Sequence, residues 1–138
     1  MGEENLTAMF NENNTPFAKA LGMVFTHISK DRLEAELEVT KERCTMPDVL
    51  HGGAIMALAD NMGGVGAHLN MPPGATTATI ESKTNFLRAI PVGQKVRAVT
   101  TPVNLGRTLQ VWQTRISRAD GKLAAIVTQT QLISTDKK

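Results

Sequence analysis

The chain has 138 residues, of which 41% are hydrophobic and 20% charged, with a net charge of +2 and one cysteine. These values fit one globular domain over residues 1–138, exclude an internal disulfide and favour a reducing compartment, so we expect a cytoplasmic protein. The acidic, polar N-terminus does not read as a signal peptide, and no run approaches 18 apolar residues. We therefore expect no membrane partner.

Charge is unevenly distributed along the chain. Residues 1–79 carry five basic and ten acidic side chains, whereas residues 80–138 carry ten basic and three acidic ones. A basic second half suits a phosphate-bearing ligand or an acidic partner, and it equally suits strands that display Lys and Arg to solvent. We expect no nucleic-acid partner, because the sequence has no basic helix, no zinc-ligand spacing and no tyrosine.

The first predicted element is a short helix over residues 15–22, because a Thr-Pro pair opens this stretch and a glycine closes it. Two strands follow. The second of them, residues 32–40, alternates apolar side chains with glutamates, which is typical of a half-buried antiparallel strand. A loop containing Pro47 then leads into a long helix, residues 51–70, which the sequence MPPGA ends.

Four further strands are predicted in the remainder of the chain, where Val, Ile and Thr dominate. They cover residues 76–90, 94–106, 107–119 and 122–134. An Asp-Gly pair between the last two marks a tight hairpin. One long helix among six antiparallel strands predicts an α+β fold in which the helix lies on one face of the sheet.

The long helix, HGGAIMALADNMGGVGAHLN, has two contrasting faces at about 100° per residue. We expect the larger side chains to pack on the sheet: His51, Ile55, Leu58, Met62, Val65 and Leu69. The opposite face carries small residues and one acid: Gly53, Ala57, Asp60, Gly64 and Ala67. Each interior glycine costs about 0.5–1 kcal/mol relative to alanine. Because small residues let a second backbone come close, we expect a two-fold dimer on this face; a helix wrapped entirely by its own sheet is the alternative.

Asp60 is the only carboxylate in the long helix. Among small residues such a group must be paired, hydrogen-bonded or functional, and burial would strengthen it as a base; a structural Asp bonded to backbone is the alternative. The helix start, His51 to Gly53, presents unpaired N–H groups that suit an oxyanion. Since Asp60 lies about 12 Å along the helix from Gly52, the two groups can reach one carbon only from two antiparallel protomers.

These features resemble the hotdog-fold acyl-CoA thioesterases, in particular the phenylacetate-pathway-like (PaaI-type) branch. The resemblance extends from about residue 17 to residue 133, and its motifs are HGGAIMALAD, NFLRAIPVGQKV, LGRTLQVWQTRI and DGKLAAIVTQT. It implies a sheet wrapped around the helix, with homodimers as the catalytic unit and often homotetramers. It also implies hydrolysis of an acyl-CoA thioester, with coenzyme A as part of the substrate and no separate cofactor.

The resemblance implies roles for individual residues. Asp60 would act as nucleophile or general base, the Gly52 N–H of the other subunit would contact the oxyanion, and His51 would support the helix start and touch substrate. Further positions would line the substrate site: Gly53, Asn61, Thr45, Thr79, Arg88, Arg107 and Thr108. Thr45 stands where some relatives have Asn, and Asp48 where glycine is common, which leaves open the groups that position water.

Other classes of protein are less compatible with the sequence. It has no G-x-S-x-G motif, and its three histidines show no metal-ligand spacing, so we expect no α/β-hydrolase and no metal. Cys44 is interpreted as incidental, with a nucleophilic role as the alternative. A non-catalytic acyl-CoA binder is the alternative function, and a hotdog dehydratase is disfavoured. Four residues are assigned to the core, with the lining of an acyl tunnel as the alternative: Met23, Phe25, Phe86 and Leu87.

Overall fold

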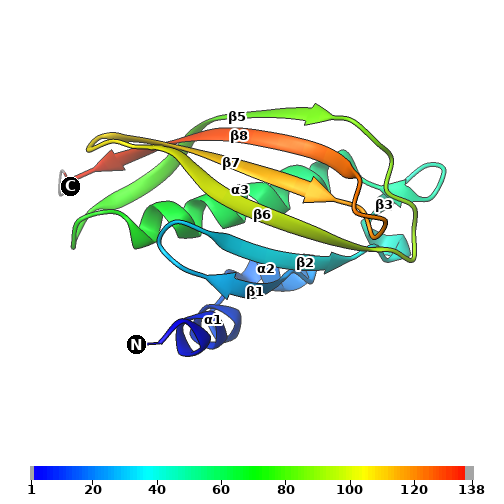
Figure 1. Ribbon diagram of the computed structural model, residues 1–138, viewed down its shortest axis with the longest axis horizontal. Coiled ribbons are helices and arrows are strands. Elements are labelled where there is room, and N and C mark those ends of the chain that lie inside the picture. The colour runs from blue at the N-terminus through cyan, green and yellow to red at the C-terminus, as the bar shows by residue number, and fades with distance from the viewer. Residues whose placement is uncertain (1, 136–138) are drawn as a thin grey trace.

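The computed structural model describes residues 2–135, so Met1 and residues 136–138 of the expected domain lie outside the described residues. Its helices are α1 (Glu3–Glu12), α2 (Pro16–Leu21), the short 3₁₀ helix η1 (Lys41–Arg43) and α3 (Gly52–Leu69). Its strands are β1 (Val24–Ile28), β2 (Leu33–Glu38), β3 (Cys44–Thr45), β4 (Val49–Leu50), β5 (Thr76–Phe86), β6 (Lys95–Leu105), β7 (Leu109–Ser117) and β8 (Leu123–Ser134) (Figure 1).

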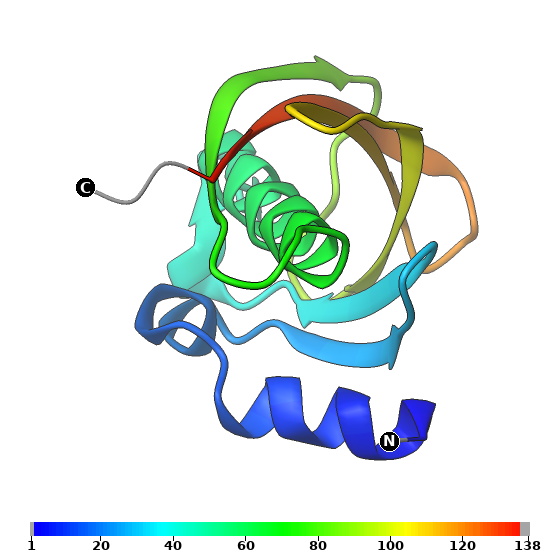
Figure 2. The same cartoon turned by 90° about the vertical axis from the view of Figure 1, so that its left-hand side faces the viewer.

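Six of the strands form one antiparallel sheet in the order β1-β2-β6-β7-β8-β5. Seen end-on, the sheet curls around α3 and leaves that helix uncovered between β5 and α2 (Figure 2). The short strands β3 and β4 pair with each other just before α3 begins. The predicted α+β fold, an antiparallel sheet wrapped around one long helix, is confirmed.

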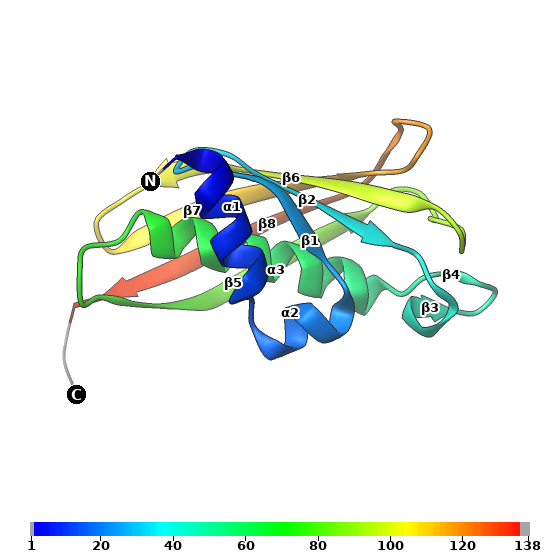
Figure 3. The same ribbon diagram turned by 90° about the horizontal axis from the view of Figure 1, so that it is seen from below.

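Helix α2 has the ends that its sequence predicts. The Thr15 hydroxyl accepts a hydrogen bond from the Ala18 N–H at 3.2 Å, and Pro16 occupies the first helical position. Gly22 ends the helix with a φ of 86°, in the left-handed region that glycine adopts without strain. Between these two ends, α2 lies beside the start of α3 (Figure 3).

Helix α1 was not predicted from the sequence. It packs along the outside of β1 (Figure 3). The Asn11 side chain accepts a hydrogen bond from the Phe25 N–H and donates one to the Phe25 carbonyl, each at 2.8 Å. Asn11 thus satisfies backbone groups on β1, an edge strand of the sheet, that would otherwise be open to another chain.

The core lies between α3 and the concave face of the sheet. Trp112 and Met62 are fully buried there, together with Ile55 and Leu58. Two glycines of α3 permit this close packing. A side chain at position 63 would overlap the Gln129 amide, and one at position 66 would press on the Trp112 ring.

The predicted division of α3 into two faces is partly wrong. Val65 and Leu69 are half-buried and pack against the core as predicted, whereas His51 is exposed and Ala67, predicted on the open face, is fully buried beside Ala75 and Ile133. The reason is that a curled sheet covers a broader and rotated arc of the helix than a flat one. The other four residues predicted on that face, which we call the open face of α3, are Gly53 and Asp60, which are exposed, and Ala57 and Gly64, which are half-buried.

None of the helices within residues 2–135 is long and apolar enough to cross a membrane.

Phe86 and Leu87, assigned to the core from sequence, are 55% and 50% exposed in the single chain, so that assignment is wrong. The exposure of Phe86, the last residue of β5, and of Leu87 after it follows from the position of β5 at the edge of the sheet, where one side of the strand has no neighbour among the described strands.

Candidate active site

The start of α3 presents one free backbone donor. His51 is the N-cap: its Nδ1 accepts a hydrogen bond from the Gly53 N–H at 2.7 Å, and its carbonyl accepts one from the Ala54 N–H at 2.9 Å. The described residues supply no acceptor for the N–H of Gly52, the first helical residue. This amide therefore remains available to an oxygen atom at the positive end of the helix dipole.

The side-chain bond of His51 also fixes its ring. Because Nδ1 accepts, the neutral ring carries its proton on Nε2 and can donate there. Steric crowding explains why glycine follows His51 at both positions 52 and 53. A Cβ at position 52 would lie 3.2 Å from the Phe86 ring, and one at position 53 would lie 2.9 Å from His51 Nδ1.

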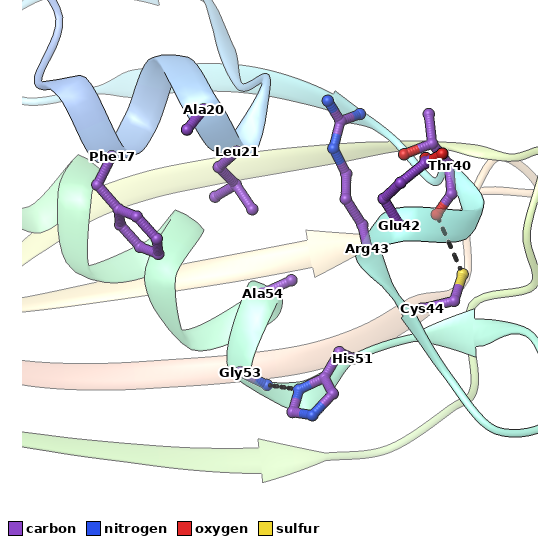
Figure 4. A pocket seen from close by; sticks show the side chains of 10 residues that line it. All are labelled: Phe17, Ala20, Leu21, Thr40, Glu42, Arg43, Cys44, His51, Gly53 and Ala54. Atoms are coloured by element: carbon purple, nitrogen blue, oxygen red, sulfur yellow. Dashed lines mark hydrogen bonds between the residues drawn. The ribbon is translucent and has the colours of Figure 1, made fainter.

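A pocket of about 510 Å³ opens beside this helix start (Figure 4). Phe17 and Leu21 of α2 line one side, and Arg43 and Cys44 of the loop before α3 line another. The His51 N–H donates to the Arg43 carbonyl at 2.9 Å, which ties this loop to the helix start. The Cys44 thiol donates to a backbone carbonyl at 3.3 Å and is only half-buried.

Asp60 lies on the open face of α3, exposed in the single chain and next to β5. The Thr79 hydroxyl of β5 donates to its Oδ1 at 2.7 Å. Asp60 lines a second pocket, of about 450 Å³, with Asn61, Gly64 and Thr15 at the start of α2. The structure therefore brings together three of the predicted site residues, Asp60, Asn61 and Thr79.

Asn61 is held in place by the segment that joins α1 to α2. Its Nδ2 donates to Asn14 Oδ1 at 3.2 Å, and its Oδ1 accepts from the Thr15 hydroxyl at 3.3 Å. Phe10 of α1 lines the same pocket as Asp60. The N-terminal helix and its linker thus form part of the wall around the carboxylate.

Arg88 lies near Gly52 in the single chain. Both residues line a third pocket, of about 410 Å³, together with Phe86 and Leu87. Arg88 Nη1 donates to the Leu123 carbonyl at 2.7 Å, which holds the guanidinium at the end of β5. A cation is therefore present on the same side of the molecule as the free Gly52 amide.

Thr45 and Asp48 belong to the β3–β4 hairpin that precedes α3. The Asp48 N–H donates to the Thr45 carbonyl at 2.8 Å, and Thr45 is exposed. Asp48 has a φ of 78°, a left-handed conformation in which glycine is unstrained and Asp is among the better-tolerated residues. This backbone conformation suits the glycine that the resemblance implies at the position.

Arg107 and Thr108 are not brought to the helix start within one chain. They lie at the β6–β7 turn, where Arg107 shares a pocket with Leu69 and Asn70 at the far end of α3. The Thr108 carbonyl accepts from the Ile133 N–H at 2.8 Å. Any role of these two residues beside His51 and Gly52 would require a second subunit.

Two buried side chains near Asp60 were missed by the sequence analysis. Gln129 and Gln131 lie on the inward face of β8, and Gln131 contacts Thr79. A signal was available, because the run VTQTQLI places both glutamines in alternation with the core residues Val127 and Ile133. Polar residues at core positions are expensive unless they are hydrogen-bonded, so they mark a built network.

Comparison with known proteins is consistent with this architecture. The family model described as Thioesterase superfamily matches residues 48–125. The chain is 35% identical over 120 residues to the 1,4-dihydroxy-2-naphthoyl-CoA hydrolase of Escherichia coli, covering 87% of this chain and 85% of that protein. It is 35% identical over 102 residues to the proofreading thioesterase EntH of Cronobacter sakazakii, covering 74% of each.

Solved structures show the same relationship. The crystal structure of a thioesterase from Haemophilus influenzae superposes with a TM-score of 0.84 at 31% identity, covering 97% of this chain and 91% of that chain. A mutant of the phenylacetic acid degradation protein PaaI from Thermus thermophilus superposes with a TM-score of 0.79 at 25% identity, covering 86% of this chain and 98% of that one.

The chain belongs to the Thioesterase superfamily, and its predicted hotdog fold and PaaI-type resemblance are confirmed. Within that superfamily it is a thioester hydrolase, as the sequence predicts. Within residues 2–135, no cluster of three or more His, Cys, Asp or Glu side chains could hold a metal ion.

Proposed function

We propose that this protein hydrolyses an acyl-CoA thioester to a free acid and coenzyme A at a site shared by two subunits. The observation that carries the proposal is the distance, within one chain, between two groups that suit thioester hydrolysis. The unpaired Gly52 amide and the Asp60 carboxylate lie at different pockets of the chain, about 12 Å apart along one helix. An antiparallel pair of α3 helices places each amide beside the partner's carboxylate.

The chemistry needs few groups, because a thioester carbonyl is strongly electrophilic. Asp60 either attacks the carbonyl carbon or removes a proton from a water molecule that attacks it. Negative charge then develops on the carbonyl oxygen, where the Gly52 N–H and the His51 Nε2–H donate. Collapse of the tetrahedral intermediate breaks the carbon–sulfur bond, and the thiolate of coenzyme A leaves and takes up a proton. When water is the nucleophile, this step gives the free acid directly. When Asp60 is the nucleophile, it gives a mixed anhydride on Asp60, which water then hydrolyses to the free acid and the Asp60 carboxylate.

The free edge of the sheet and the open face of α3 support the dimer. Strand β5 ends the sheet, so one of its edges has no partner strand among the residues that the structure describes. Ile80 and Phe86 on this strand are 56% and 55% exposed. An unpaired edge strand beside exposed apolar side chains favours pairing with a second copy of the same strand. That pairing would lay the two α3 helices side by side.

A tetramer of two such dimers is also part of the proposal. Exposed apolar side chains gather where the end of β6, the start of β7 and the end of β8 meet. Those that are at least 40% exposed are Val103, Leu105, Leu109 and Leu132. Clustered apolar residues of this kind are typical of a contact surface. Sedimentation of the wild-type protein distinguishes a dimer from a tetramer.

Arg88 is proposed to bind phosphate groups of coenzyme A, because it lies beside Gly52 in the third pocket. We expect Arg88→Ala to raise KM for an acyl-CoA about ten-fold with little change in kcat, since one charged hydrogen bond is lost. KM should also rise with salt. Lys95→Ala, which removes a surface charge paired only with Glu36, is the matched control. An unchanged KM in Arg88→Ala would remove Arg88 from the site.

Arg107 and Thr108 enter the proposal from the second subunit. With Gly52 beside the partner's Asp60, the far end of the partner's α3 extends nine residues, roughly 13 Å, past the start of this helix, so the partner subunit's Arg107 would meet the distal phosphates of a bound coenzyme A. Arg107→Ala should then raise KM as Arg88→Ala does. If Arg107→Ala leaves KM and its salt dependence unchanged, the charge belongs to a solvated surface.

The direct test of the proposed function is release of free thiol from a panel of acyl-CoA substrates. The panel should contain aromatic, short aliphatic and long aliphatic acyl groups, including 1,4-dihydroxy-2-naphthoyl-CoA, the substrate in the name of the Escherichia coli relative. Hydrolysis of at least one member is expected. Binding of acyl-CoA without thiol release from any member would favour the non-catalytic binder instead.

A further inference from the structure

Two buried glutamines form a hydrogen-bonded chain that leads to Asp60. Gln129 and Gln131 are 0% and 1% exposed. Gln129 Nε2 donates to the Ala59 carbonyl of α3 at 2.8 Å, and Gln131 Nε2 donates to Gln129 Oε1 at 2.8 Å and to Thr79 Oγ1 at 2.6 Å. Thr79 then donates to Asp60 Oδ1 at 2.7 Å.

The chain of bonds has a fixed direction, because it begins at a backbone carbonyl, which can only accept. Gln129 must turn its amide nitrogen toward Ala59, so its oxygen faces Gln131. Gln131 must therefore turn its nitrogen toward both Gln129 and Thr79, and its oxygen accepts from the Thr77 hydroxyl at 3.0 Å. The Thr79 oxygen is occupied as an acceptor, so its single hydrogen points to Asp60.

We propose that Gln131 is a positioning residue for the catalytic carboxylate: through Thr79 it fixes the rotamer of Asp60 and the direction of the bond that Asp60 accepts. This inference rests on the proposed function. One carboxylate oxygen, Oδ1, is held by the network, and the described residues give Oδ2 no hydrogen-bond partner. Oδ2 is thereby left for the thioester carbon or for water.

A purely structural role would not require this arrangement. A buried amide gains little stability over an apolar side chain of the same shape, because desolvation offsets its hydrogen bonds. The chain also contains a buried glutamine that lacks the connection. Gln110 is 1% exposed; it donates to the Asn70 carbonyl at 3.2 Å and accepts from Trp112 Nε1 at 3.0 Å, at the far end of α3. It provides a matched control.

The test compares Gln131→Met with Gln110→Met in the full-length protein. We expect Gln131→Met to lower kcat about 10²-fold with KM unchanged, because a small misplacement of the carboxylate lengthens the reacting distance. Gln110→Met should keep kcat within about two-fold of the wild-type value, while lowering the melting temperature about as much as Gln131→Met does. Equal kcat in both variants would overturn the inference.

A second variant guards against misfolding of Gln131→Met. Thr79 is exposed on the edge strand, so Thr79→Val should fold normally; it should match Gln131→Met in kcat, and the double variant should lose no more than either. Thr79→Ser keeps the hydroxyl and should restore most of kcat. Additive losses, or no rescue by serine, would contradict a shared pathway through Thr79.

A measurement without turnover separates this inference from the proposed function. The ¹³Cγ resonance of Asp60 at neutral pH should shift in Gln131→Met and stay unchanged in Gln110→Met. If the wild-type protein hydrolyses no thioester but this shift occurs, the proposed function fails and the positioning stands. If hydrolysis depends on Asp60 but neither the Asp60 resonance nor kcat changes in Gln131→Met, the positioning role of Gln131 is contradicted while the proposed function stands.

Discussion

Replacing Asp60 by asparagine is expected to lower kcat for thioester hydrolysis by about 10²–10⁴-fold, the contribution typical of a positioned general base. Asparagine has the same shape and still offers an oxygen to the Thr79 hydroxyl, so the hydrogen bond seen at 2.7 Å can persist. The substitution therefore removes the negative charge and basicity while leaving the local structure in place. The measurement is kcat and KM on the best substrate of the acyl-CoA panel.

The control for this variant is Asp31→Asn, which removes a carboxylate from the exposed turn between β1 and β2. It should retain wild-type kcat. Sedimentation should show that Asp60→Asn has the same oligomeric state as the wild type, so that lost activity is not lost assembly. Wild-type turnover in Asp60→Asn would make Asp60 a structural residue.

Gly64→Leu is expected to convert the dimer to monomers and to abolish activity with it. Gly64 lies on the open face of α3, and apart from its chain neighbours and the nearby helix backbone, no atom of the described residues lies within 4 Å of a Cβ built there. A Cβ at position 64 therefore causes no clash within its own subunit, and leucine favours a helix over glycine by about 0.5–1 kcal/mol. We expect a folded chain of equal or higher melting temperature that sediments as a monomer.

Two neighbouring substitutions define what this result means. Gly64→Ala adds the smallest side chain and should weaken the dimer far less than leucine does. Gly63→Ala, one position away, would overlap the Gln129 amide within the same chain, so it should lower the melting temperature instead. A Gly64→Leu protein that stays dimeric and active would show that no second subunit covers this face.

The fold was largely predictable because its signals are local. Alternation in residues 32–40, the Asp-Gly turn and the ends of α2 each depend on residues close in sequence. The same reasoning could have found α1, where Leu6 and Phe10 are spaced by one helical turn behind two glutamates. What failed was the assignment of Ala67 to the open face, since the curl of a sheet depends on contacts between distant strands.

The candidate site was predictable in part. The free amide at Gly52 follows from the helix start, and the isolation of Asp60 among small residues is visible in the sequence. The contact between Asp60 and Thr79 is not, because it depends on how β5 lies against α3 and on a register shift within β5 near Thr79. The glutamine pair was not predicted for the same reason: the Ala59 carbonyl, which accepts the hydrogen bond from Gln129, lies 70 residues away in sequence.

The central claim is that each site combines Asp60 of one subunit with the Gly52 amide of the other. It can be tested by mixing two inactive variants, Asp60→Asn and Gly52→Pro. Proline removes the N–H and fits the first helical position, after a residue whose φ and ψ of −62° and 135° suit it. Because its Cβ would lie 3.2 Å from the Phe86 ring, Gly52→Ala, which adds the same Cβ and keeps the N–H, is the control. We expect Gly52→Pro alone to lose about 10²–10³-fold in kcat, as for other oxyanion donors.

After denaturation and refolding together in equal amounts, half of the dimers would be hybrids, each with one intact site and one doubly altered site. A site shared between subunits predicts that the mixture regains about a quarter of wild-type activity, as follows from random two-fold pairing. Activity that stays at the level of the separate variants, with hybrid dimers present, would contradict a site shared between subunits.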